Sequence, residues 1–312
     1  MTARLVLEPE IRVSREAARR FLIRRGLLQR CPGDKPAPAG TGGALHVVRR
    51  LEYVQVDPML VLERSHDLVL AARVEDYRPG ILDTLLYRER KLVEVLARNR
   101  LIVPVEDYPL FSVRFADTER ENRSRVAELE PVMERVLRRI EAEGPLSSLD
   151  FEDKATLSGW WDADGQARTR VVRQALEWLW YFGRLVISHR EGSRRYFDLP
   201  ERVLGPEVLG GNAGSAAGRA GSPRGDSAVG GAARDRTAAE RELRDALALK
   251  YFRAMGLADP RDWSLGWSRY TAPEKKDLIA RLAAAGEIVP VAVEGVKTTY
   301  LVPASEVDDL VR

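Results

Sequence analysis

Residues 175–200 read ALEWLWYFGRLVISHREGSRRYFDLP, and residues 281–303 read RLAAAGEIVPVAVEGVKTTYLVP. Each stretch is a helical pattern that ends at a glycine, Gly183 or Gly286, followed by two β-type runs that meet at a Glu-Gly turn. In both, the glycine lies eight residues before the turn glutamate and seventeen before the closing proline. Glycine can adopt the left-handed conformation that ends a helix, and Glu-Gly between alternating runs marks a hairpin. The sequence therefore predicts a repeated helix–hairpin unit.

A third, looser copy of this pattern occupies residues 79–109, where a helix leads into two β-type runs around residues 98–100. Further helices are predicted at 15–28 (capped by Ser14), 44–53, 118–143 and 236–255. Helices followed by a hairpin form the winged-helix arrangement, a variant of helix-turn-helix. We therefore expect a mainly α fold with short β-hairpin wings, of the α+β class, built from tandem winged-helix units. Such units bind DNA, although some serve as protein-interaction modules.

Two stretches of low complexity divide the chain. Residues 32–43 are rich in Pro, Gly and Ala, and residues 205–233 contain almost no large apolar side chain, so burial cannot offset the entropy lost on ordering them. The predicted organisation is a first winged-helix unit at 1–115 with a flexible insert at 32–43, a second unit at 116–204, a disordered linker at 205–233 and a third unit at 234–312.

The overall composition is that of a globular protein. Of 312 residues, 45% are hydrophobic and 31% charged, and neither a membrane-spanning run nor a secretory signal is evident. We therefore expect a cytoplasmic, nucleoid-associated bacterial protein, and a monomer. Cys31 is the only cysteine, which excludes an internal disulfide and a cysteine-rich zinc site. Neither a metal nor an organic cofactor is expected.

Arginines are clustered along the chain, although the net charge is only +3. Clustered guanidinium groups can neutralise phosphates, so the clusters predict double-stranded DNA as the partner. A high-GC genome would also raise the arginine content, but it does not explain the clustering. The arginines predicted to bind DNA are Arg168, Arg170, Arg173, Arg190, Arg194 and Arg195.

Residues 51–74, LEYVQVDPMLVLERSHDLVLAARV, carry the polar groups best suited to chemistry. In an extended backbone, Gln55 and Asp57 project from one face. Because Pro58 follows, Asp57 could instead cap a helix. A cap does not account for the glutamine, nor for the further polar residues Glu63, Arg64, His66 and Asp67 within the same thirteen residues.

This pair fits the hydrolysis of an N-glycosidic bond. A carboxylate can deprotonate water or stabilise an oxocarbenium-like sugar, while an amide positions the water. An N7-alkylated base already carries positive charge and leaves without a general acid. Glycosylases that also act as lyases form a Schiff base through lysine. Since no lysine lies between Lys35 and Lys91, no lyase step is expected from the motif.

The run Tyr53-Val54-Gln55-Val56-Asp57-Pro58 resembles the signature of the YcaQ-like crosslink-repair DNA glycosylases, whose motif is Gln-apolar-Asp, or Gln-apolar-Gln in the AlkZ branch. Arg64, His66-Asp67-Leu68, residues 91–94 and 102–104, Ser158-Gly159-Trp160-Trp161, residues 175–185 and 195–203, and the region from about Glu240 to Pro303 extend the resemblance in family order. The resemblance implies a monofunctional glycosylase that excises bulky N7-alkylguanines and unhooks N7-linked interstrand crosslinks.

By this resemblance, Gln55 and Asp57 are the catalytic residues, and Arg64, His66 and Asp67 support them. Trp178 and Trp180 are expected in a helix core rather than as stacking platforms for bases. The family continues into a C-terminal β-rich domain, which the sequence to Arg312 does not include. The alternative is a non-catalytic winged-helix DNA-binding protein, either a regulator or a truncated pseudo-enzyme.

Overall fold

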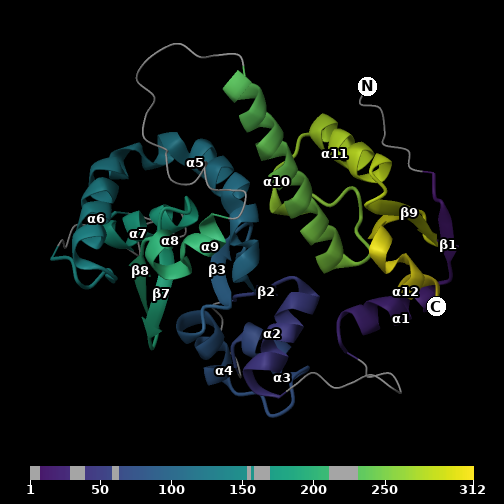
Figure 1. The fold of residues 1–312 in the computed structure, drawn as a ribbon, viewed down its shortest axis with the longest axis horizontal. Coiled ribbons are helices and arrows are strands. Elements are labelled where there is room, and N and C mark those ends of the chain that lie inside the picture. Colours follow the sequence, from purple (N-terminus) through teal and green to yellow (C-terminus); the bar gives the residue numbers. More distant parts are fainter. Residues whose placement is uncertain (1–7, 29–38, 58–62, 153–155, 158–168, 211–230) are drawn as a thin grey trace. The chain divides into compact units, whose positions relative to one another are not determined.

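The computed structural model describes residues 8–28, 39–57, 63–152, 156–157, 169–210 and 231–312 (Figure 1). The chain folds as two compact units: unit 1 is Met1–Ile81 with Ser227–Arg312, and unit 2 is Leu82–Asp226. Both consist mainly of helices with small antiparallel hairpins, which confirms the predicted α+β class. The boundaries of these two compact units differ from those of the predicted winged-helix units. The reason is that one sheet of unit 1 contains a strand from the start of the chain and two strands from near residue 300.

Unit 1 begins with β1 (Ile11–Val13), α1 (Arg15–Arg25), α2 (Gly40–Leu51), β2 (Val54–Gln55), α3 (Ser65–Ala71) and the first residues of α4 (Pro79–Asp83). It resumes with α10 (Gly231–Met255), the 3-10 turn η4 (Leu265–Trp267), α11 (Ala272–Ala284), β9 (Ile288–Val293), β10 (Thr299–Pro303), η5 (Ala304–Glu306) and α12 (Val307–Val311). β9 pairs with β1 in parallel and with β10 antiparallel. Figure 1 shows β1 beside β9. Phe21 of α1 and Leu310 of α12 pack with Val291 and Val302 in the core beside this sheet.

Unit 2 begins with the π-helical turn η1 (Thr84–Arg88), β3 (Leu92–Leu96), β4 (Arg100–Pro104), η2 (Val105–Phe111), α5 (Ser112–Val126), η3 (Ala127–Leu129) and α6 (Glu130–Glu143). It continues with β5 (Thr156–Leu157), β6 (Thr169–Arg170), α7 (Val171–Tyr181), β7 (Val186–Glu191), β8 (Arg194–Asp198), α8 (Pro200–Leu204) and α9 (Pro206–Leu209). Its core packs α6 against α7 and the β7–β8 hairpin. Trp178 and Trp180 are buried in this core, as predicted.

The two predicted copies of the repeat form the same local structure. Gly183 after α7 and Gly286 after α11 have φ angles of 68° and 70°, and the turn glycines Gly192 and Gly295 have 59° and 69°. These are left-handed values that glycine adopts without a steric penalty. In each copy, one residue ahead of the helix also pairs with the second hairpin strand, through the bridges Leu146–Phe197 and Ala258–Leu301. The predicted repeat is therefore confirmed.

Several predicted boundaries were wrong. The single helix expected over 118–143 is interrupted at Ala127–Leu129, because Pro131 at the start of α6 has no N–H to continue the preceding helix. The insert predicted at 32–43 overlaps α2, which begins at Gly40, while residues 32–38 lie outside the described residues. The predicted linker contains α9, whose Pro206 occupies a position that favours helix starts, and its last residues belong to α10. Residues 211–230 lie outside the described residues.

Candidate active site

The motif segment, residues 53–57, leaves the end of α2 through an unusual backbone turn. Glu52 caps α2 with φ 71° and ψ −25°, a left-handed conformation that side chains with a Cβ rarely adopt. Val54 is then buried, while Gln55 is exposed at the end of β2 and Asp57 is half-buried two residues further on. The turn at Glu52 and the burial of Val54 therefore fix the backbone on which the exposed Gln55 lies.

An aromatic cluster holds the start of this segment. The Tyr53 ring meets Trp267 edge-on, with centroids 5.3 Å apart, and Trp267 meets Tyr251 in the same way at 5.4 Å. The Tyr251 hydroxyl donates to the carboxylate of Asp262. Burial, together with the nearby charge of Asp262, raises the pKa of Tyr53 above its ordinary value, so this ring remains neutral. Edge-to-face packing of large rings fixes their mutual geometry, and this restricts the segment two residues before Gln55.

Helix α3 contacts β2 and carries the predicted supporting residues. His66 and Asp67 are buried, with His66 Nε2 3.6 Å from Asp67 Oδ2. The Tyr77 hydroxyl donates to Asp67 Oδ1 over 2.6 Å. Arg64 is exposed at the N-cap of α3. The histidine and aspartate thus form a buried polar pair, bonded to Tyr77, on the helix that contacts β2.

Sequence reasoning did not single out the role of Arg73, which ties α3 to α1. Its Nε donates to the carbonyl of Gly26 over 2.7 Å, and its Nη1 donates to the carbonyl of Val69 over 2.8 Å. The proposed helix cap by Asp57 involves residues 58–62, which lie outside the described residues. Within the described ranges, no group of three or more His, Cys, Asp or Glu side chains could hold a metal ion. No helix there is long and apolar enough to cross a membrane.

The predicted DNA-binding arginines of unit 2 fall into two groups. Arg170 is exposed just before α7, and Arg173 on its first turn has 60% of its side chain exposed. Arg194 is exposed on β8 and donates to the hydroxyl of Tyr196 over 3.2 Å. Arg173 Nε also lies 3.7 Å from the carboxylate of Glu177, but its side chain, like those of Arg170 and Arg194, is accessible to a phosphate. Arg168 lies outside the described residues.

Arg190 and Arg195 are less exposed, with 19% and 11% of their side chains accessible, and both bind buried carboxylates. Arg190 donates to both carboxylate oxygens of Glu94, over 3.1 and 2.6 Å, and to the hydroxyl of Tyr87 over 2.8 Å. Arg195 donates to Glu177 over 2.5 Å, and its guanidinium lies 5.7 Å from the centre of the Trp180 ring. Burial, opposed by the charge of Glu177, lowers the pKa of Arg195. The structure therefore places these two arginines as ties between the hairpin and the core.

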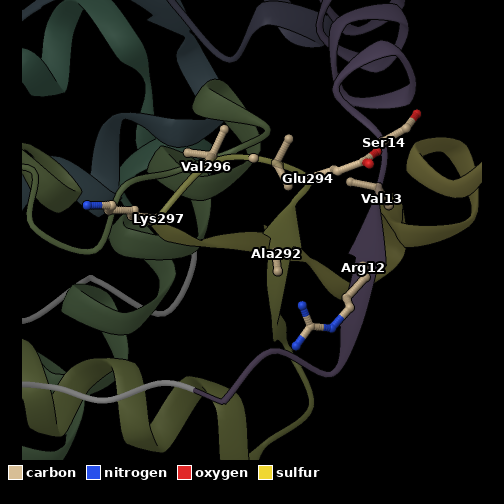
Figure 2. A pocket seen from close by; sticks show the side chains of 9 residues that line it. Arg12, Val13, Ser14, Ala292, Glu294, Val296 and Lys297 are labelled. Carbon is tan, nitrogen blue, oxygen red and sulfur yellow. The ribbon is translucent and has the colours of Figure 1, made fainter.

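A hollow of about 670 Å³ lies where β1 meets the β9–β10 turn. Arg12, Ser14, Glu294 and Lys297 contribute its polar side chains. Figure 2 shows the amine of Lys297 extending away from the guanidinium of Arg12. None of the lining residues belongs to the motif segment or to α3. The hollow is therefore separate from the candidate active site, and the charged ends of Arg12 and Lys297 do not converge on a common ligand position.

The family model described as DNA glycosylase AlkZ-like matches residues 48–312. This range includes the motif segment, α3 and the whole of unit 2. The match defines the class of protein as a DNA glycosylase, whose substrate is DNA. The chain belongs to the AlkZ-like DNA glycosylase family, which confirms the resemblance found in the sequence.

A solved structure, the Streptomyces sahachiroi DNA glycosylase AlkZ, is similar to this chain with a TM-score of 0.61. The alignment covers 96% of this chain and 72% of that one, at 16% sequence identity. At this level of identity the likeness concerns the fold. It agrees with the mainly helical α+β architecture described above.

Proposed function

We propose that the protein is a monofunctional DNA glycosylase that hydrolyses the N-glycosidic bond of bulky N7-alkylguanines and unhooks N7-linked interstrand crosslinks. Asp57 activates the attacking water or stabilises the developing positive charge on the sugar, and the Gln55 amide positions that water. The observation that carries this proposal is the exposed Gln55 at the end of a strand anchored by buried Val54 and by the Tyr53–Trp267 contact. A rigid support of this kind is what the positioning of a water molecule requires.

The proposed reaction ends at base release, without strand cleavage. A lyase step would need an accessible lysine amine to attack the sugar. Lys250 packs next to the motif segment, but its amine is fully buried and donates to Glu52. Borohydride should therefore trap no protein–DNA adduct, and abasic DNA should accumulate until alkali cuts it. A trapped adduct that maps to a lysine would overturn this part of the proposal.

DNA contact is proposed through tandem winged-helix units at 1–115, 116–204 and 234–312. The element order supports the second and third units, since α6, the Leu146–Phe197 bridge, α7 and its hairpin correspond to α10, the Ala258–Leu301 bridge, α11 and its hairpin. Arg173 is exposed on α7, and every other residue of that helix is buried. Phosphates would therefore meet the start of α7 and the wing at Arg194, rather than a full helix face.

The test is release of free base from duplex DNA carrying an N7-alkylguanine. Asp57→Asn and Gln55→Ala should nearly abolish release while duplex affinity stays within a few fold, because water activation belongs to the transition state and affinity comes mainly from phosphates. Asparagine caps helices about as well as aspartate. Full excision by purified Asp57→Asn would return this residue to a capping role. Binding without base release by the wild type would favour a non-catalytic DNA-binding protein.

A further inference from the structure

The turn at Glu52 needs an external support. A left-handed conformation at a residue with a Cβ is strained, and such strain persists only where surrounding contacts hold it. The turn sets the direction in which β2 leaves α2, so it also sets where Gln55 lies three residues later. Whatever holds the Glu52 side chain therefore acts on the position of the motif.

Two cations of α10 hold this carboxylate. Lys250 Nζ donates to one oxygen over 2.9 Å, and Arg253 Nε donates to the other over 2.7 Å. Lys250 is fully buried, with 0% of its surface exposed, and the Glu52 side chain is 13% exposed. Lysine is almost never fully buried unless it is paired. The buried Lys250 amine therefore holds the Glu52 carboxylate away from solvent, whereas a surface ion pair stays exposed to water.

A second contact joins the same two helix ends. The buried guanidinium of Arg25 donates to the carbonyls of Arg50 on α2 and Arg253 on α10. Its Nε lies 3.0 Å from the carboxylate of Glu306. A cation at the carbonyl end of a helix is favourable, because the last carbonyls have no partner within the helix. The end of α2 is thus tied to α10 twice, once through its backbone and once through the Glu52 side chain.

We propose that Lys250 is a positioning residue for Gln55 and Asp57. It holds the Glu52 carboxylate and thereby fixes the left-handed turn from which β2 departs. The inference rests on the proposed function, because it assigns a role in that reaction. Over three extended residues, about 10 Å of chain, a rotation of roughly 6° at the turn moves Gln55 by about 1 Å. A misplacement of that size can cost on the order of a hundredfold in rate.

The experiment measures single-turnover base release, duplex affinity and thermal stability of the full chain, with duplex DNA carrying one N7-methylguanine as the probe. Lys250→Met should slow release at least about tenfold, with affinity within about threefold of the wild type. The matched control is Asp245→Asn, which breaks the 2.6 Å pair between Asp245 of α10 and Arg281 of α11. It should lower the Tm without slowing release when all variants are assayed well below their Tm.

The double variant Glu52→Asn/Lys250→Met separates positioning from general stability. Asparagine adopts the left-handed conformation more readily than glutamate, and it leaves no buried carboxylate without its lysine. This variant should recover release to within about threefold of the wild type, which loss of stability alone would not predict. If Lys250→Met releases base at the wild-type rate, or if the double variant is no faster than Lys250→Met, the positioning role is refuted.

Failure of the proposed function can be distinguished from failure of this inference. If the wild type itself releases no base, amide hydrogen exchange across residues 53–57 decides the matter. Faster exchange there in Lys250→Met, with normal exchange in the double variant and in Asp245→Asn, would support the role of Lys250 in fixing the segment. Unchanged exchange in Lys250→Met would overturn it.

Discussion

Replacement of Arg190 by methionine separates a structural role from DNA binding. Glu94 has only 4% of its surface exposed, and the Arg190 side chain is 19% exposed, so the change leaves a carboxylate buried without its main partner. Removal of one partner from a buried ion pair typically costs about 3–5 kcal/mol. Because the Tyr87 hydroxyl still donates to Glu94 over 2.6 Å, we expect the lower end, about 3 kcal/mol. For a domain of this size that corresponds to a fall in Tm of roughly 6–12 °C.

The assay is urea and thermal unfolding of three variants in a double-mutant cycle. Glu94→Gln should cost less than Arg190→Met, because the partly exposed guanidinium can reach water. Glu94→Gln/Arg190→Met should recover most of the loss, giving a coupling energy of about 2 kcal/mol, within the range found for residues in one network. A loss below about 1 kcal/mol in Arg190→Met, together with weaker DNA binding by the folded protein, would refute the structural assignment.

Three further outcomes are expected. Gly183→Ala should destabilise the protein by about 3 kcal/mol in thermal unfolding, because the added Cβ would lie 2.4 Å from Phe115 Cδ2 at a φ of 68°. Gly192→Ala places its Cβ in open space and should cost only about 1 kcal/mol. Equal losses in the two variants would contradict this prediction. Arg194→Ala should leave the Tm unchanged and reduce the slope of log affinity against log salt by about 1; an unchanged slope would remove this arginine from the DNA contacts. Burial alone would raise the pKa of Glu94, but the charge and hydrogen bonds of its arginine partner hold that pKa below its ordinary value. The stabilisation by Glu94 is therefore fully present above the pKa of the unfolded state, and it is lost as the pH falls through the pKa of the folded state. When the free energy of unfolding is measured at pH values from about 4.3 downward, it should fall less steeply in Glu94→Gln than in the wild type.

The features predicted from sequence are those that depend on local backbone chemistry. Gly183 and Gly286 end their helices as expected because a left-handed residue without a Cβ suits a helix end, and this holds wherever the segment lies in the fold. Ser14 likewise begins α1, with its hydroxyl accepting from the N–H of Ala17 over 3.1 Å. The helix expected across 127–129 is interrupted for a local reason as well, because Pro131 has no N–H with which to continue the helix before it.

The remaining features depend on contacts between distant residues. The left-handed turn at Glu52 has no local signal, because it is stabilised by Lys250 and Arg253, about two hundred positions away. In the sequence, Arg190 is one more basic residue of a predicted wing, and only the fold places it against Glu94. Clustering of arginines therefore located a charged region but could not separate those that face solvent from those with buried partners. The motif pair Gln55 and Asp57 stays a prediction, supported by an exposed position on an anchored strand.

The parallel pairing of β1 with β9 has a consequence for the order in which the chain can fold. Ile11 pairs with Val291, so the first strand leaves the ribosome long before its partner has been synthesised. At about 5–20 residues per second, this interval is on the order of 14–56 s. Unit 2 is continuous in sequence from Leu82 to Asp226 and can pack its core during that time. Phe21 and the rest of the α1 face must wait for Val291 and Val302 to complete their core. Nascent chains should thus expose this apolar face until Val291 and Val302 have been synthesised, which makes the first helix the expected binding site for a chaperone.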